Sequence, residues 1–283
     1  MNKKYLLGVD GGTEGIRAGI FDFSGTALAY ASTTYPTQFP APSWAEQDPD
    51  DWWDALGKSV RKAIQDSGIG VDQIATMAVD TTCCSVVALD ASGNPVRPAL
   101  IWMDVRSAEQ AEQSVETGDV ALRINSNGNG PVSAEWMIPK ALWIKQNEPE
   151  IFERAVIICE YQDYINLHLT GRLVASINNV SVRWHCDYSR DGVPKSLLEK
   201  LDLEELAEKW PQEVLQLGEV VGGLTHRAAE HLGLTPDLPV VQGGADAQIG
   251  MIGLGVIKPG SLALITGSSH LHLGLSEKPF HGT

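Results

Sequence analysis

Residues 6–22 read LLGVDGGTEGIRAGIFD, and this stretch decides the fold class that the sequence predicts. An apolar run leads to Asp10, two glycines follow, and a second apolar run comes after them. Such runs predict two buried strands, over residues 5–10 and 17–23, that are joined by a tight turn. Because glycine lets backbone N–H groups converge on an anion, the turn is a candidate phosphate site, although it lacks the lysine of a P-loop.

Asp10 lies directly before this turn, where a carboxylate can serve either chemistry or local structure. A carboxylate repels phosphate, but it can hold Mg²⁺, often through water, and the metal then bridges to phosphate oxygens. Gly11 and Gly12 would supply backbone amides, and Thr13 would add a hydroxyl. The other interpretation is a tight hairpin with a capping aspartate, and this stretch alone leaves both open.

The neighbouring sequence extends the two strands into a meander that is followed by a helix. FSGT at 23–26 predicts a hairpin, after which residues 27–34 return as a third antiparallel strand. Asp48 and Pro49 are typical of an N-cap and a first helical residue, so we expect a helix from there to about Ser67. Its buried side would carry Trp52, Trp53, Leu56, Val60 and Ile64.

Strand and helix patterns alternate along the rest of the chain, which indicates a mixed α/β fold. Strands are expected within 74–80, 84–96, 99–105, 155–160, 238–242 and 260–275. Helices are expected from near 107, over 137–147 and 161–169, at the end of the mixed segment 178–210, and from 246 onward.

Three strand ends carry a glycine beside a polar residue. They are DGGT at 10–13, GGAD at 243–246 and TGSS at 266–269. Because ligands of open α/β sheets bind where strands end, three such turns suit one phosphate-handling cleft. Asp246, at the expected start of a helix, could be a general base or an ordinary N-cap. TGSS could equally be a solvent-exposed turn.

Further polar residues occur at element ends. Asp104 and Arg106 could hydrogen-bond a polyol or an anion, or they could form a surface ion pair. Glu135 and Trp136 place an acid beside an aromatic ring, which suits a sugar and equally a capping carboxylate next to a core tryptophan. His270 and His272 alternate on a strand without a third ligand nearby in the sequence, so we expect them to be structural or solvent-facing.

The four cysteines are Cys83, Cys84, Cys159 and Cys186, and no CxxC pair occurs. Zinc and a disulfide framework are therefore not expected, and we expect a cytoplasmic protein with reduced thiols. No charge near Cys83 and Cys84 in the sequence would lower a thiol pKa. Roles as small pocket or core residues are therefore favoured over a role as nucleophiles.

Charge and hydropathy exclude several classes of protein. The formal net charge of −15 argues against binding to nucleic acid, which would require a basic face. No segment approaches the roughly 18 apolar residues of a membrane span, and the N-terminal apolar run reaches Asp10 too soon for a signal peptide. A site for one nucleotide stays compatible with the acidity, because a few local groups can hold it.

The motifs, in this order, resemble the FGGY family of carbohydrate kinases over essentially the whole chain. The stretches that carry the resemblance are GVDGGTEGIRAGIFD, EQDPDDWW, AVDTTCCSVVALDASGNPV, ALIWMDVRS, SAEWMIPKALWI, QGGADAQIGMIGLG and ITGSS. The resemblance implies the actin-like, ribonuclease-H-like ATPase fold, with a mixed central sheet and flanking helices. It also implies transfer of the γ-phosphate of MgATP to a hydroxyl of a sugar or polyol.

The same resemblance implies a role for each motif. Asp10 would be the metal-organising carboxylate, and Asp246 would be the catalytic base. The phosphate side would comprise Gly11, Gly12, Thr13, Arg17, Gly267 and Ser268. The sugar side would comprise Thr82, Cys83, Trp102, Asp104, Glu135 and Trp136.

The sugar is predicted from the branch of the family that the chain resembles. Cys83 and Cys84 stand where glycerol kinases carry an Arg-Glu pair and where xylulokinases tend to carry Met-His. VDTT followed by a small residue, with SAEW and IPK further on, looks more like the ribulokinases. A ketopentose such as ribulose is therefore the expected substrate, and xylulose, erythritol and glycerol are the alternatives.

Members of this family are usually about twice as long as this chain of 283 residues. Residues 1–255 would form the sugar-binding and catalytic N-terminal domain. Residues 256–283 would begin the crossover to a second domain that supplies most adenine and ribose contacts. A non-catalytic sugar-binding half-kinase and another actin-like ATPase are the alternatives. The sequence leaves the oligomeric state open, with a homodimer as one candidate.

Overall fold

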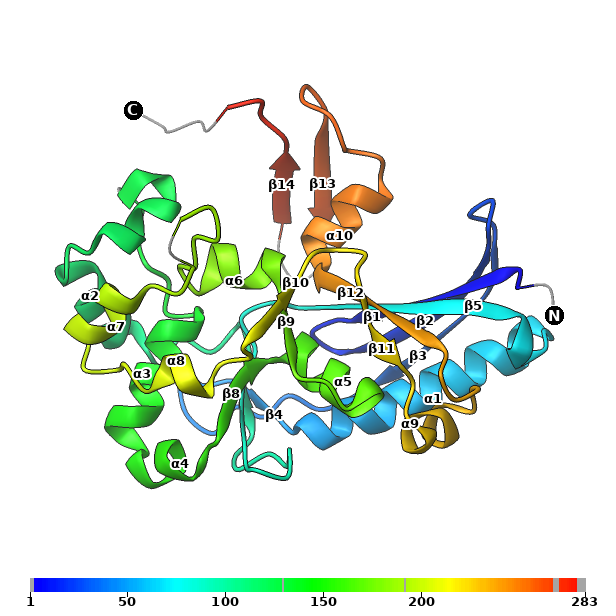
Figure 1. The fold of residues 1–283 in the computed structure, drawn as a ribbon, viewed down its shortest axis with the longest axis horizontal. Helices are drawn as coiled ribbons and strands as arrows, with labels where there is room; N and C mark the ends of the chain where they lie inside the picture. Colours follow the sequence, from blue (N-terminus) through cyan, green and yellow to red (C-terminus); the bar gives the residue numbers. More distant parts are fainter. Residues whose placement is uncertain (1–2, 129, 191, 267–269, 279–283) are drawn as a thin grey trace.

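The computed structural model describes residues 3–128, 130–190, 192–266 and 270–278, which form two lobes and a C-terminal hairpin (Figure 1). Within these residues, the central sheet has six strands in the order β11-β12-β5-β1-β2-β3. They are β1 (Tyr5–Gly11), β2 (Gly15–Asp22), β3 (Ala27–Thr34), β5 (Ile74–Thr81), β11 (Val220–Gly223) and β12 (Pro239–Ala245). β1, β2 and β3 pair antiparallel, which confirms the predicted meander. β5 runs parallel to β1 and β12, so the carboxyl ends of these three strands meet at one edge.

Helix α1 (Pro49–Ser67) packs against β2 and β3 and has the predicted ends. Its N-cap is Asp48, whose side chain accepts a hydrogen bond of 3.0 Å from the amide of Asp50. The helix ends at Gly68, which has a φ of 68°, a conformation that glycine adopts without strain. Beside it lie α5 (Tyr161–Thr170) and α9 (His226–Leu232), and the apolar side chains between these helices and the sheet form the larger core.

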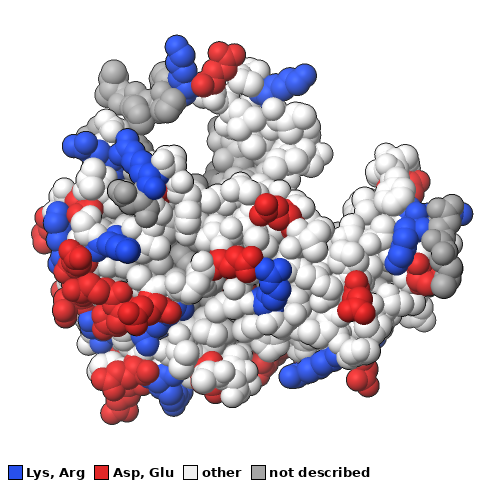
Figure 2. All heavy atoms as spheres, viewed as in Figure 1, with Lys and Arg blue, Asp and Glu red and all other residues white. Residues whose placement is uncertain are grey.

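The second lobe is built on a smaller sheet, in the order β4-β7-β6-β8. Its strands are β4 (Glu46–Gln47), β6 (Val86–Leu89), β7 (Ala99–Leu100) and β8 (Ile157–Glu160), and the parallel pair β9 (Val174–Ser176) and β10 (Glu213–Leu215) lies beside it. Its helices are α2 (Ala108–Glu116), α3 (Met137–Asn147), α4 (Pro149–Arg154), α6 (Ile177–Arg183), α7 (Lys195–Lys200) and α8 (Leu206–Lys209). Figure 2 shows acidic side chains gathered over this lobe, on the left of the view.

Most differences from the sequence-based expectation fall in the second lobe. The strand expected within 99–105 is only the two residues of β7. The segment 178–210 ends in two short helices, α7 and α8, where one helix was expected. Helix α4 was not predicted, although Pro149 at its first position is a typical start. Short elements such as these take their stability from packing rather than from a periodic pattern, so the sequence marks them weakly.

Helix α10 (Asp246–Gly253) leads into a hairpin of β13 (Leu262–Thr266) and β14 (His270–Gly274), which Figure 1 shows above the central sheet. The two predicted strands are confirmed, and the predicted turn between them lies outside the described residues. Leu262 and Leu264 are 65% and 55% exposed, so β13 presents apolar side chains to solvent.

The glycine pairs at the strand ends differ from the predicted turns. Gly11 is the last residue of β1, and only Gly12 belongs to the turn, where its amide donates to the carbonyl of Gly15 at 3.0 Å. Gly243 and Gly244 lie inside β12. A Cβ atom on Gly243 would lie 2.0 Å from the carbonyl oxygen of Val79. This glycine therefore allows β12 to approach β5 closely.

We expect Gly243→Ala to destabilise the protein by about 1–3 kcal/mol or more, because the contact is with backbone and no side chain can rotate away from it. The midpoint of urea unfolding measures the change. Gly253→Ala is the matched control, because a Cβ there meets nothing within 4 Å. In a helix that change stabilises by about 0.4–1 kcal/mol. Equal midpoints for the two variants would contradict the steric explanation.

Candidate active site

A cavity of about 780 Å³ opens at the edge where β1, β5 and β12 end. It brings together most of the predicted site residues, namely Asp10, Gly12, Thr13, Arg17, Thr82, Cys83, Trp102, Glu135 and Asp246. Gly11, Asp104 and Trp136 do not line it. Gly267 and Ser268 lie outside the described residues. The cavity thus joins the first two glycine-containing strand ends to the side chains proposed for a sugar.

Three carboxyl groups gather at one end of this cavity because of strand register. Asp10 on β1 is the direct partner of Asp80 on β5, and Ala245 on β12 pairs with Thr81. Asp246 follows Ala245 as the first residue of α10 and lines the same cavity. Adjacent parallel strands therefore bring together aspartates that are far apart in the sequence.

The three carboxyl groups do not ionise equally. Burial, followed by the charges of Asp10 and Asp246, raises the pKa of Asp80 to about 8. Burial also raises the pKa values of Asp10 and Asp246, and Arg17 lowers both. The guanidinium of Arg17 lies 2.5 Å from the Asp10 carboxylate. A raised pKa in Asp246 suits a group that takes a proton near neutral pH.

Thr13 is held from two sides. Its hydroxyl accepts a hydrogen bond of 2.9 Å from the indole N–H of Trp102, and its carbonyl accepts one of 2.8 Å from the side-chain amide of Gln47. The Tyr35 hydroxyl donates to the carbonyl of Gly12. These bonds fix the turn after β1, and they tie it to Trp102, which also lines the cavity.

The cavity is also lined by Thr82, Cys83, Trp102, Glu135 and Arg183. Arg183 is the last residue of α6, and its guanidinium lies 5.5 Å from the ring centroid of Trp136. Trp136 itself is only 7% exposed and packs in a small apolar cluster with Cys84, and Cys83 and Trp102 pack against this cluster. It supports the wall and holds the cation, while Glu135 lines the cavity.

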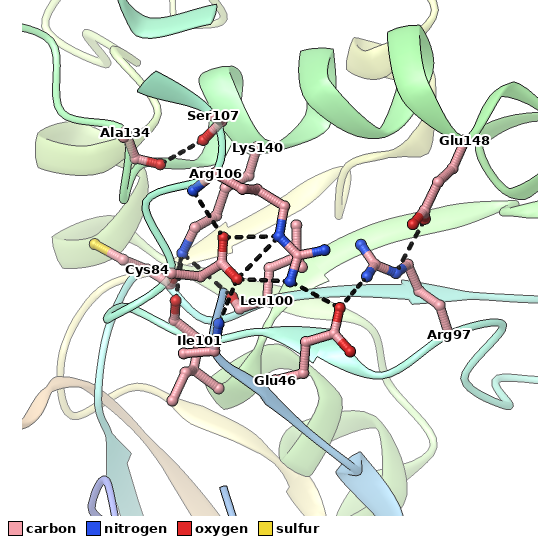
Figure 3. Close-up of polar contacts among 12 residues, drawn as sticks. Glu46, Cys84, Arg97, Leu100, Ile101, Arg106, Ser107, Ala134, Lys140 and Glu148 are labelled. Atoms are coloured by element: carbon pink, nitrogen blue, oxygen red, sulfur yellow. Dashed lines mark hydrogen bonds and ion pairs between the residues drawn. The ribbon is translucent and has the colours of Figure 1, made fainter. Parts of the chain in front are cut away.

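Asp104 and Arg106 lie neither in the cavity nor at the surface. Both side chains are fully buried, and Asp104 accepts hydrogen bonds from the Ala45 amide at 2.6 Å and from Arg106 Nε at 2.9 Å. Arg106 also donates to Glu46 at 2.8 Å, and Arg97 reaches the same Glu46 oxygen at 2.6 Å (Figure 3). The Arg106 guanidinium lies 3.7 Å from the Trp44 ring centroid. This buried ion-pair network supports the loop that carries Trp102.

Lys140 holds the two loops that form the cavity wall. It is fully buried on α3, and its Nζ donates to the carbonyls of Cys84 and Ile101 at 2.7 Å each and of Leu100 at 3.3 Å (Figure 3). Burial lowers its pKa to about 8. Because one ammonium group bridges both loops, Cys83 and Trp102 are held at fixed positions relative to each other.

No group of three or more His, Cys, Asp or Glu side chains in the described part of the chain is arranged to hold a metal ion. His270 and His272 on β14 are exposed, which agrees with the expectation that they are structural or solvent-facing. In the same part of the chain, no helix is long and apolar enough to cross a membrane.

The match to known proteins agrees with this geometry. Residues 5–253 match the N-terminal domain of the FGGY family of carbohydrate kinases. The chain belongs to this family. It is 31% identical to a ribulokinase of Geobacillus thermodenitrificans, an alignment that covers 100% of the chain and 55% of the relative. It is 28% identical to a xylulose kinase of Staphylococcus epidermidis, with coverage of 97% and 54%.

Solved FGGY structures share the fold. A ligand-bound xylulose kinase from Lactobacillus acidophilus superposes with a TM-score of 0.87 over 98% of this chain and 55% of that one, at 24% identity. The chain therefore has the actin-like ATPase fold of these sugar kinases and corresponds to its N-terminal half. It spans about 55% of the length of the curated ribulokinase that it matches.

Among the residues of this FGGY cavity that sequence reasoning did not name are Asp80 and Arg183. Asp80 ends a predicted strand, and its position beside Asp10 at a strand end could have identified it. Arg183 lies in the mixed segment 178–210, where no motif points to it. Only the fold brings α6 next to the loop of Cys83.

Proposed function

We propose that this chain supplies the sugar-binding and catalytic half of a kinase that transfers the γ-phosphoryl group of ATP to a sugar or polyol hydroxyl. The observation that carries the proposal is the shared cavity. It is lined by Asp246 and Asp10 and also by Glu135 and Trp102. A sugar bound in it could place one hydroxyl beside the Asp246 carboxylate, with the incoming phosphate beside Asp10.

Asp246 is proposed as the general base. One of its carboxylate oxygens accepts a hydrogen bond of 2.7 Å from the Ala247 amide, which fixes the side chain at the start of α10. It would accept the proton of the substrate hydroxyl as that oxygen attacks the γ-phosphorus and the bond to the β-phosphate oxygen breaks. Such phosphoryl transfer depends mainly on positioning and charge stabilisation, so fixed groups of this kind account for most of the catalysis.

The acidic end of the cavity fits Mg²⁺ bound together with ATP. Asp10 and Asp80 offer the hard oxygen ligands that Mg²⁺ prefers, and Mg²⁺ in phosphate-transfer sites typically uses one or two carboxylates with water and phosphate. That usage agrees with the absence of an all-protein metal cage among the described residues. When bound, the ion would neutralise charge on the phosphate oxygens. Arg17 and the hydroxyl of Thr13 would lie on the phosphate side.

A ketopentose such as ribulose is the substrate that we propose. Support comes from the ribulokinase relative at 31% identity and from the small side chains of Cys83 and Cys84 in the cavity wall. Xylulose, erythritol and glycerol are the alternative substrates. The xylulose kinase relative at 28% identity supports xylulose as one of them.

Sugar-dependent ADP release tests the activity. We expect the protein that contains this chain to release ADP with ribulose at a higher kcat/KM than with xylulose, erythritol or glycerol. A higher value for another sugar would contradict the ketopentose assignment. ADP release that is independent of every sugar would contradict the kinase itself.

A non-catalytic sugar-binding half-kinase is the second candidate. The observation that favours it is coverage, because the chain spans only 55% of its ribulokinase relative. Calorimetry of the 283-residue chain separates the two. Binding of a sugar without any turnover of MgATP would favour the binding module, and turnover would exclude it.

A further inference from the structure

Cys83 and Cys84 form a dithiol in the wall of the cavity. Their Sγ atoms lie 3.7 Å apart, and both residues line the cavity. Cys83 is half-buried, while Cys84 is only 2% exposed. Cys159 and Cys186 are buried free thiols outside this cavity. The chain therefore contains one pair of neighbouring thiols, and its two other thiols are single and buried, so they can serve as controls.

The two neighbouring thiols differ in their electrostatic environment. The thiol of Cys84 donates to the sulfur of Cys83, which lowers the pKa of Cys83, and the nearby guanidinium of Arg183 lowers it as well. Burial and Glu160 oppose this effect. The pKa of Cys84 is raised, first by the same hydrogen bond and then by burial. Arg183 forms no ion pair within the described residues, so its charge stays available to the Cys83 thiolate.

The backbone at this pair is strained and fixed. Cys84 has a φ of 65°, in the left-handed region that few non-glycine residues adopt. Its amide donates to Glu160 at 3.1 Å, and its carbonyl accepts from Lys140 at 2.7 Å. Strain that is held from both sides is typical of functional positions. It leaves rotation about the two Cα–Cβ bonds as the way for the sulfurs to move.

We propose that Cys83 and Cys84 are a peroxide-oxidisable dithiol that closes to a vicinal disulfide. The Cys83 thiolate attacks one oxygen of a hydroperoxide, the O–O bond breaks, and Cys83 becomes a sulfenic acid while hydroxide, or alkoxide, takes up a proton and leaves. The Cys84 thiol then attacks the Cys83 sulfur, the S–S bond forms, and water leaves. The dithiol loses two electrons and the peroxide gains them. Thiol reductants reverse the reaction.

The geometry supports each step. The cavity gives peroxide access to Cys83, and the buried Cys84 lies next to the sulfur that it must attack. The sulfurs have to approach from 3.7 Å to the disulfide length of about 2.05 Å. Adjacent Cα atoms lie about 3.8 Å apart across a trans peptide, closer than in most disulfides, so the ring closes with strain. A disulfide in such a strained loop is reduced more readily than a relaxed one, as a reversible site requires. The chemistry does not depend on the proposed kinase activity.

Peptide mass spectrometry after treatment of the chain with hydrogen peroxide tests the proposal. We expect the peptide that holds Cys83 and Cys84 to lose two hydrogens, and to regain them with dithiothreitol, while Cys159 and Cys186 stay reduced. Oxidation of Cys159 or Cys186 at the same rate would overturn the assignment. So would a disulfide between two copies of the chain, or no loss of hydrogens at all. This readout uses the unmodified sequence, so it requires no variant to fold.

Variants then separate the two roles. Cys84→Ser should leave a sulfenic acid on Cys83 that dimedone traps, whereas Cys83→Ser should leave Cys84 unlabelled. Arg183→Gln should slow formation of the disulfide, because it removes a cation that lowers the pKa of Cys83. Cys159→Ser and Cys186→Ser are the matched controls and should oxidise as the parent chain does. Dimedone labelling of Cys84 in Cys83→Ser would overturn the order of attack.

Discussion

Replacing Asp246 with asparagine is expected to lower kcat for sugar phosphorylation by about 10²- to 10⁴-fold, because the amide cannot accept the hydroxyl proton. The side chain keeps its size, so the fold and sugar binding should be retained. A coupled ADP-release assay measures turnover, and calorimetry measures sugar affinity. The combination of lost kcat and unchanged affinity distinguishes a base from a residue that only holds the sugar.

Asp54→Asn is the control for this change. Asp54 is an exposed aspartate on α1, outside the cavity, so kcat should stay at the value of the parent protein. If Asp246→Asn kept more than about a tenth of kcat, the base would have to be another group. Asp80, with its raised pKa, would be the next carboxyl group to examine.

Arg106→Met is expected to lower the free energy of unfolding by about 3–5 kcal/mol, because it leaves Asp104 as an uncompensated buried carboxylate. Glu46 loses one of its two cations and keeps Arg97. Arg106 contacts both acids, and its guanidinium lies against the rings of Trp44 and Trp143. Methionine keeps much of the apolar contact but removes the charge. Urea unfolding followed by tryptophan fluorescence measures the loss.

Lys62→Met provides the comparison. Lys62 pairs with Asp66 one helical turn away on α1, and the two side chains are 58% and 39% exposed. Exposed pairs of this spacing contribute about 0.3–0.5 kcal/mol, so the unfolding midpoint should hardly move. Similar losses for both variants would show that the Arg106 network contributes no more than a surface pair.

The sequence predicted the first lobe well because its elements carry strong local patterns. The meander of β1 to β3 has apolar runs broken by glycine, and α1 has an N-cap, a proline start and a glycine end. The second lobe was harder, because its strands are as short as the two residues of β7. Its stability comes from long-range contacts such as the Arg106 network, which no local pattern indicates.

Strand ends were the strongest guide to the residues that line the cavity. Asp10 lies at the end of β1 and Asp246 directly follows β12, and both were named from that position. Asp104 was placed with them because it was expected to end a strand, yet β7 ends at Leu100 and the Asp104 carboxylate is buried against Arg106. Arg183 reaches the cavity only through the packing of α6, which the sequence pattern does not reveal. The direction of a side chain at a strand end depends on neighbours that are distant in sequence.

The hydrogen bond from Trp102 to Thr13 couples the positions of two side chains that both line the cavity. A molecule that displaces the Trp102 ring must also release or reorient the Thr13 hydroxyl. Sugar and nucleotide would then influence each other's affinity before either contacts the other, and by equal factors in both directions.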